Sequence, residues 1–174
     1  MRIILCTQKL LKEMGNPPLV DVPADSEGLG NWYANIIRID GKKCLLFTNE
    51  KTLYSLLIPN VRKANLKNIV DEFLINLSFN LQAEGVGLDV ISKIMQEYHD
   101  IGFAKTASKK VLGSMNQIAF EWEVRVQMKE GPDNIRVLEM NKEMNRTLRS
   151  NQTGKEYFYP IERAVELIAS IFGR

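Results

Sequence analysis

Residues 32–48 read WYANIIRIDGKKCLLFT, and this stretch decides the fold class. Apolar and β-branched side chains fill the runs on either side of Asp40 and Gly41. Asp-Gly between two such runs is the strongest short-range signal of a β-hairpin, because both residues tolerate the backbone of a tight turn. The stretch therefore predicts two antiparallel strands, at 32–39 and 43–48.

Two further strands are predicted outside this hairpin. Residues 2–6 (RIILC) form a short apolar run of strand length, and residues 52–58 form another that ends at Pro59. Proline ends a strand because it has no amide hydrogen to donate. We expect the four strands to form a small antiparallel sheet.

After Pro59 the apolar side chains recur with the spacing of a helix. About five helices are expected to pack against the sheet, which makes the fold class α+β. The main ones are predicted at 65–81, 88–98, 108–128, 131–144 and 160–172, and a short one follows Thr7. Residues 120–128 also alternate as a strand would, so their sequence leaves helix and strand open.

The composition is that of an ordinary globular protein, with 174 residues, 45% of them hydrophobic and 25% charged. This length is typical of one domain, so we expect a single domain over 1–174. No run approaches the roughly 20 apolar residues that cross a bilayer, and Lys9 and Lys12 interrupt the first apolar run. We therefore expect a cytoplasmic protein without a membrane partner.

Cysteine and histidine are scarce. Cys6 and Cys44 both lie in apolar runs, where a reduced thiol behaves as a small hydrophobic side chain. His99 is the single histidine, and no Cys-x-x-Cys motif is present. The sequence therefore predicts no metal site and no cofactor, and it favours structural cysteines over a catalytic cysteine–histidine pair.

The first polar segment with a chemical interpretation is KTASKKVLGSMN, residues 105–116. Ser108 can cap the predicted helix, and the free amide groups at a helix start attract anions. Lys105, Lys109 and Lys110 would reinforce that attraction, and Ser114 and Asn116 follow on the same helix. The alternative interpretation is a capped helix with solvated lysines.

The second polar segment, TNEKT at 48–52, lies where two predicted strands meet. Asn49 can satisfy backbone groups in the turn, and Glu50 would act as a general base if it were partly buried near a lysine. An exposed turn carboxylate is the commoner case. Together with a lysine near the N-terminus, the two segments give this candidate site: Lys9, Asn49, Glu50, Lys105, Ser108, Lys110, Ser114 and Asn116.

The segment 145–159 combines Arg146 and Arg149 with Tyr157, Phe158 and Tyr159. Arginines beside aromatic side chains can hold single-stranded nucleic acid by charge and stacking. Anchoring of the last helix to the core explains the aromatic residues equally well, and we favour this interpretation.

Four stretches, ILCTQKLL (4–11), NWYAN (31–35), LFTNEKTL (46–53) and KTASKKVLGSMN (105–116), resemble a family of small bacterial proteins known only as a domain of unknown function. The resemblance runs from the first strand to residues 159–161. It implies a compact domain with a shared polar site, and it implies no reaction.

Three functions remain open. The first is a binding module that recognises an anionic ligand or a protein partner, with nucleic acid as a weaker alternative. The second is a metal-independent enzyme acting on a phosphodiester or similar substrate, with Glu50 or His99 as base. The third is a regulatory protein of a toxin–antitoxin or phage-defence locus. A pocket with Glu50 within hydrogen-bond reach of a lysine or serine would favour the enzyme.

Overall fold

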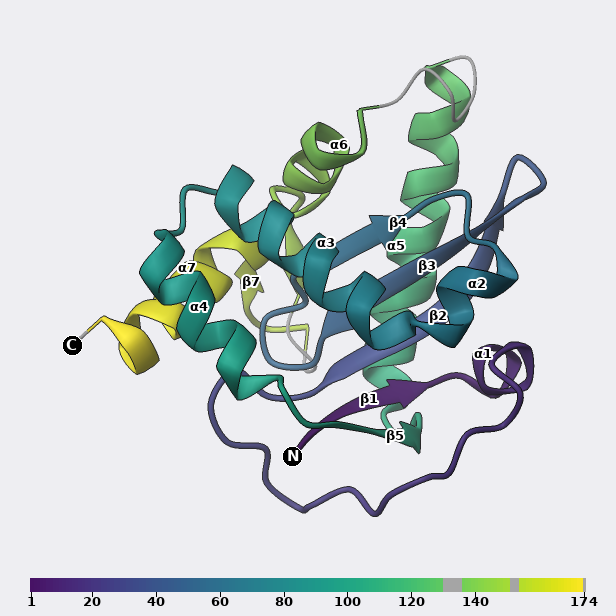
Figure 1. The fold of residues 1–174 in the computed structure, drawn as a ribbon. Coiled ribbons are helices and arrows are strands. Elements are labelled where there is room, and N and C mark those ends of the chain that lie inside the picture. Colours follow the sequence, from purple (N-terminus) through teal and green to yellow (C-terminus); the bar gives the residue numbers. More distant parts are fainter. Residues whose placement is uncertain (130–135, 151–153, 174) are drawn as a thin grey trace.

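The computed structural model describes residues 1–129, 136–150 and 154–173, and in these ranges it has an α+β fold (Figure 1). Five strands form one sheet in the order β4-β3-β2-β1-β5. The strands of this sheet are β1 (Arg2–Cys6), β2 (Trp32–Ile39), β3 (Lys42–Asn49), β4 (Ser55–Ile58) and β5 (Ile101–Lys105). A separate two-stranded ribbon joins β6 (Arg149–Ser150) to β7 (Tyr157–Phe158).

The sheet is mixed, which corrects the predicted antiparallel sheet. The β2–β3 and β3–β4 pairs are antiparallel as predicted, but β1 runs parallel to both of its neighbours. In the register, Ile4 lies between Trp32 of β2 and Phe103 of β5. The prediction failed because pairing direction depends on the path of the long connection between β1 and β2, which has no local signal. β5 was missed because Gly102 interrupts a short apolar run.

The β2–β3 turn has the geometry that its sequence predicts. Asp40 and Gly41 have φ values of 50° and 75°, and a two-residue hairpin turn of this type needs positive φ at both positions. Ile39 pairs with Lys42 directly before and after the turn. This hairpin fixes the register of the two central antiparallel strands.

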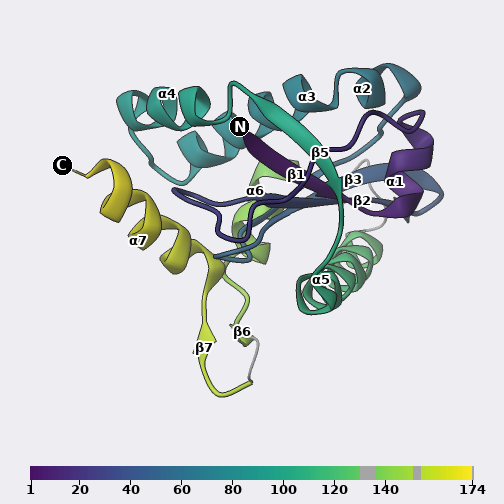
Figure 2. The ribbon, with the colours of Figure 1, turned by 90° about the horizontal axis from the view of Figure 1, so that it is seen from below.

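Helices cover both faces of the sheet, and the described ranges contain seven of them. Their bounds are α1 (Gln8–Glu13), α2 (Lys63–Lys67), α3 (Ile69–Ala83), α4 (Leu88–Glu97), α5 (Lys109–Met128), α6 (Val137–Met144) and α7 (Pro160–Phe172). Figure 2 shows α3 and α4 on one side of the sheet and α5 on the other. Alternate residues of β1 enter the two cores, with Ile4 on the α3 side and Leu5 on the α5 side.

Several helix boundaries differ from the predictions. The helix expected at 65–81 is two helices, α2 and α3, separated at Asn68. Asn65 does not begin a helix, because α2 already begins two residues earlier, at Lys63. From inside α2, the side-chain oxygen of Asn65 accepts the amide hydrogen of Arg62. Residues 120–128 are helical. The predicted start of a helix at Gly131-Pro132 lies outside the described residues.

Helix α6 closes the open edge of the sheet at β4. The side-chain oxygen of Asn141 accepts the Leu57 amide hydrogen, and its side-chain nitrogen donates to the Leu57 carbonyl. Asn145 forms the same pair of hydrogen bonds with the backbone of Ser55. Both asparagines are buried and lie one helical turn apart. They take the place of a sixth strand, so the edge offers no free backbone groups at these two residues.

None of the helices in the described ranges is both long enough and apolar enough to cross a membrane.

Candidate functional site

The turn between β3 and β4 is built around Asn49, which is almost completely buried. Its side-chain oxygen accepts hydrogen bonds from the amides of Lys51 (3.0 Å) and Thr52 (3.1 Å), and its nitrogen donates to the Leu29 carbonyl. Leu53 in the same turn has a φ of 56°, a left-handed conformation that is uncommon for leucine. Asn49 is therefore used in shaping the turn and has no free polar atom to offer a ligand.

Glu50 and Lys51 fasten this turn to the loop before β2. Glu50 Oε1 accepts hydrogen bonds from the Ser26 hydroxyl and from the Asn31 amide, the latter at 2.8 Å. Lys51 Nζ donates to the carbonyls of Ser26 (2.6 Å) and Gly28 (2.9 Å). These four contacts hold both side chains in fixed positions.

Gly30 lets the loop approach these side chains closely. Its φ is 80°, and a Cβ atom there would lie 2.9 Å from Lys51 Cε and 3.0 Å from Glu50 Oε1. Gly28 and Leu29 form a turn, and Gly28 and Gly30 adopt positive φ values of 58° and 80° there.

A pocket of about 260 Å³ lies beside this turn. Residues of the turn, of α5, of the β6–β7 ribbon and of α7 line it: Glu50, Lys51, Leu53, Lys110, Val111, Ser114, Ser150, Phe158 and Arg163. Three members of the sequence-predicted site, Glu50, Lys110 and Ser114, thus share one pocket. The start of α5 and the turn that carries Glu50 lie on the same side of the molecule.

Ser108 positions the start of α5. Its hydroxyl oxygen accepts the amide hydrogen of Val111 at 3.3 Å, which is the predicted cap. Its own amide donates to the Tyr33 hydroxyl at 3.2 Å. Burial raises the pKa of Tyr33, and the negative charge of Glu50 also raises it. The neutral hydroxyl therefore links β2 to the helix that carries Lys110 and Ser114.

Arg163 is the main residue of the pocket that the sequence did not predict. Its guanidinium lies over the Phe158 ring, 3.5 Å from the centroid, and forms an ion pair with Glu156 at 3.0 Å. These contacts hold the charge at the pocket wall. Arg163 was missed because it lies on a helix whose sequence shows only a packing pattern, more than 100 residues from Glu50.

The other predicted residues are not part of this pocket. Lys9, Lys105 and Asn116 are exposed and do not line it, and Ser108 acts as a helix cap. This corrects the expectation that all eight residues converge. Residues of both polar segments line the pocket, whereas Lys9 of α1 does not.

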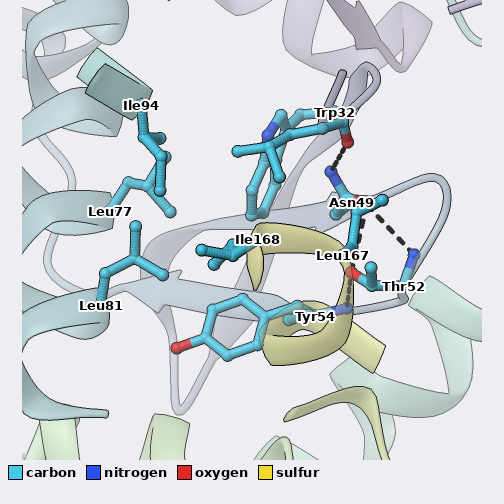
Figure 3. A pocket seen from close by; sticks show the side chains of 11 residues that line it. Trp32, Asn49, Thr52, Tyr54, Leu77, Leu81, Ile94, Leu167 and Ile168 are labelled. Atoms are coloured by element: carbon cyan, nitrogen blue, oxygen red, sulfur yellow. Dashed lines mark hydrogen bonds between the residues drawn. The ribbon is translucent and has the colours of Figure 1, made fainter. Parts of the chain in front are cut away.

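A second pocket lies under α7 and is almost entirely apolar, with about 30 Å³ of space (Figure 3). Leu167 and Ile168 of α7 form one side of this pocket. The other side is formed by Trp32, Leu77, Leu81 and Ile94, and Asn49 lies at the margin. The Trp32 indole donates to the Tyr98 hydroxyl at 2.9 Å. This small space offers few polar groups to a ligand.

Catalysis by a cysteine–histidine pair is contradicted. Cys6 and Cys44 are buried in the cores on opposite faces of the sheet, and His99 is exposed. Burial raises the pKa of Cys6 to about 12 and also raises the pKa of Cys44. A thiol with such a pKa is protonated at neutral pH and is a poor nucleophile. Across the described ranges, no three His, Cys, Asp or Glu side chains gather in a group that could hold a metal ion.

Sequence comparison assigns the chain to a family. The model of DUF6933, a domain of unknown function, matches residues 3–163. The chain belongs to the DUF6933 family. The matched region begins in β1 and ends at Arg163, so every residue that lines the 260 Å³ pocket lies within the DUF6933 domain. A search of curated proteins gave no significant match.

Proposed function

We propose that this DUF6933 protein is a single-domain, cytoplasmic binding module that holds an anionic group of a small ligand in the pocket beside α5. The observation that carries the proposal is the meeting of Lys110, Ser114 and Arg163 at one concave site. Two cations and a hydroxyl are suitable donors for a carboxylate or phosphate, and charge-assisted hydrogen bonds are the stronger kind. The pocket is made by four segments that are far apart in sequence, so its shape depends on the folded domain.

The fixed surroundings of the pocket support a binding role. Arg163 is held by Phe158 and Glu156, and Lys51 is held by two backbone carbonyls. Side chains that are already ordered lose less conformational entropy when a ligand binds. Lys110 is exposed, and within the described ranges no acidic side chain forms an ion pair with it, so its charge is available to an anion.

Lys110→Glu is expected to weaken the binding of an anionic ligand by about tenfold or more, because it replaces attraction by repulsion inside the pocket. The free energy of unfolding should change by no more than about 0.5 kcal/mol, because the side chain is exposed. Isothermal titration with inorganic phosphate and with a carboxylate, at two salt concentrations, measures the effect.

Lys109→Glu is the matched control. Lys109 is the adjacent exposed lysine and does not line the pocket. Both variants change the net charge by the same amount, so equal weakening would show long-range attraction only and would contradict the proposed site. Unchanged affinity in Lys110→Glu would remove this lysine from it.

One contact favours an enzyme as the second candidate function. Glu50 accepts a hydrogen bond from the Ser26 hydroxyl, as a general base would from a nucleophile. Ser26, however, does not line the pocket, and the same Glu50 oxygen also accepts the Asn31 amide hydrogen, as a structural carboxylate does.

Hydrolysis of bis-p-nitrophenyl phosphate separates the two functions. An enzyme that uses Glu50 as base is expected to lose about 10²–10⁴ of its rate in Glu50→Gln. If the wild-type protein does not accelerate hydrolysis above the buffer rate, the phosphodiesterase hypothesis fails and the binding module remains.

A further inference from the structure

The pocket beside α5 carries both signs of charge. Glu50 lies in its wall together with Lys110 and Arg163. A ligand with only negative groups would gain from these two cations and from Lys51, which also lines the pocket, but would be repelled by the carboxylate. A ligand that carries a positive and a negative group can complement both.

Glu50 has one oxygen left for a ligand. Oε1 accepts hydrogen bonds from Ser26 and Asn31, whereas Oε2 accepts none from the part of the chain that the structure describes. The two contacts of Oε1 fix the direction of the carboxylate, so Oε2 is a preorganised acceptor. An ammonium group is a suitable partner, because it has three donors and a compact positive charge.

The remaining wall of the pocket is mixed, with three apolar residues beside the polar residues Lys51, Ser114 and Ser150. Leu53, Val111 and Phe158 line it, and the volume of about 260 Å³ is below the range of sites for drug-sized molecules. Leu53 enters this wall from its left-handed position in the turn, which Asn49 stabilises. The apolar part of a bound ligand is therefore small.

The geometry points to a zwitterion as the ligand, namely a free α-amino acid with an apolar side chain. Its ammonium group bonds Glu50 Oε2, its carboxylate lies between Lys110 and Arg163, and its side chain contacts Leu53, Val111 and Phe158. This inference rests on the proposed function, because the carboxylate occupies the anion site, and it adds the ammonium site and the size of the ligand.

Isothermal titration of the full chain with three probes tests the inference. L-leucine carries both charges, N-acetyl-L-leucine has lost the ammonium group, and L-leucinamide has lost the carboxylate. We expect leucine to bind about 10- to 100-fold more tightly than either derivative, which is the effect of losing one charge-assisted hydrogen bond.

Two variants test which pocket residue binds each charged group of the ligand. Glu50→Gln keeps an oxygen that can accept from Ser26 and Asn31, and it should remove the advantage of leucine over N-acetyl-leucine. Lys110→Gln should weaken leucine and N-acetyl-leucine but leave leucinamide unchanged. Lys109→Gln, outside the pocket, should change none of the three affinities.

The outcomes separate the two proposals. Equal binding of leucine and N-acetyl-leucine would overturn the zwitterion and leave the anion site in place. Binding of phosphate that depends on Lys110, without binding of leucine at millimolar concentration, would do the same. If neither leucine nor phosphate binds, or if their binding does not depend on Lys110, both the zwitterion and the proposed function fail.

Discussion

Trp122→Ala is expected to lower the free energy of unfolding by about 3–5 kcal/mol, the usual cost of removing a large buried aromatic side chain. Trp122 lies in the middle of α5 and is completely buried. It belongs to the core between α5, α6 and the sheet, which includes Met140 and Met144 of α6. Alanine would leave a cavity at the junction of these elements. Urea denaturation followed by circular dichroism measures the loss.

Phe120→Ala is the control for this prediction. Phe120 lies on the same helix, two residues earlier, but its side chain is 65% exposed. Its removal should change the free energy of unfolding by no more than about 0.5 kcal/mol. If Trp122→Ala unfolds at the same urea concentration as the wild type, Trp122 does not pack in the core between α5, α6 and the sheet as described.

Helix α5 also shows how the sequence determined part of the fold. Ile118, Trp122 and Val126 are spaced by four residues and are all buried, so helical spacing holds through the segment whose alternation also suggested a strand. The hairpin at Asp40-Gly41 was equally predictable, because its turn residues specify a local conformation. Both features are set by neighbours within a few residues.

Pairing between distant segments was not predictable in the same way. A parallel partner for β1 requires two long connections to bring β2 and β5 to its sides, and neither connection has a local pattern that states its path. The strand β5 is short and contains Gly102, which has a low strand propensity. The need for glycine at position 102 becomes visible only in the folded chain, where a Cβ atom would lie 2.7 Å from Val20 Cγ2.

The residues of the candidate site show the same difference between features with a local sequence signal and features that depend on distant segments. Glu50, Lys110 and Ser114 were found because they lie in polar segments next to predicted strand and helix ends. Asn49 was found for the same reason, but its polar atoms are used within the turn. Arg163 was not found, because only the folded chain brings α7 next to the turn that carries Glu50, and no local pattern around Arg163 indicates this contact.

The edge of the sheet gives the second large effect. Asn145→Ala is expected to destabilise the protein by about 2–4 kcal/mol, since each buried polar group left without a partner costs about 1–3 kcal/mol. Asn145 Oδ1 accepts the Ser55 amide hydrogen at 2.7 Å, and Nδ2 donates to the Ser55 carbonyl at 2.7 Å and the Asn141 carbonyl at 2.8 Å. Urea denaturation measures the loss of stability.

The same change should alter self-association, because it frees the backbone of Ser55 at the edge of β4. An unpaired strand edge can pair with the edge of another chain. We expect light scattering after gel filtration to show a concentration-dependent increase in mass for Asn145→Ala, and a larger one when Asn141→Ala is added. Asn116→Ala, at an exposed asparagine of α5, is the control and should change neither property. Wild-type stability and mass in the double variant would mean that α6 does not protect this edge, and that the two asparagines merely fill space beside it.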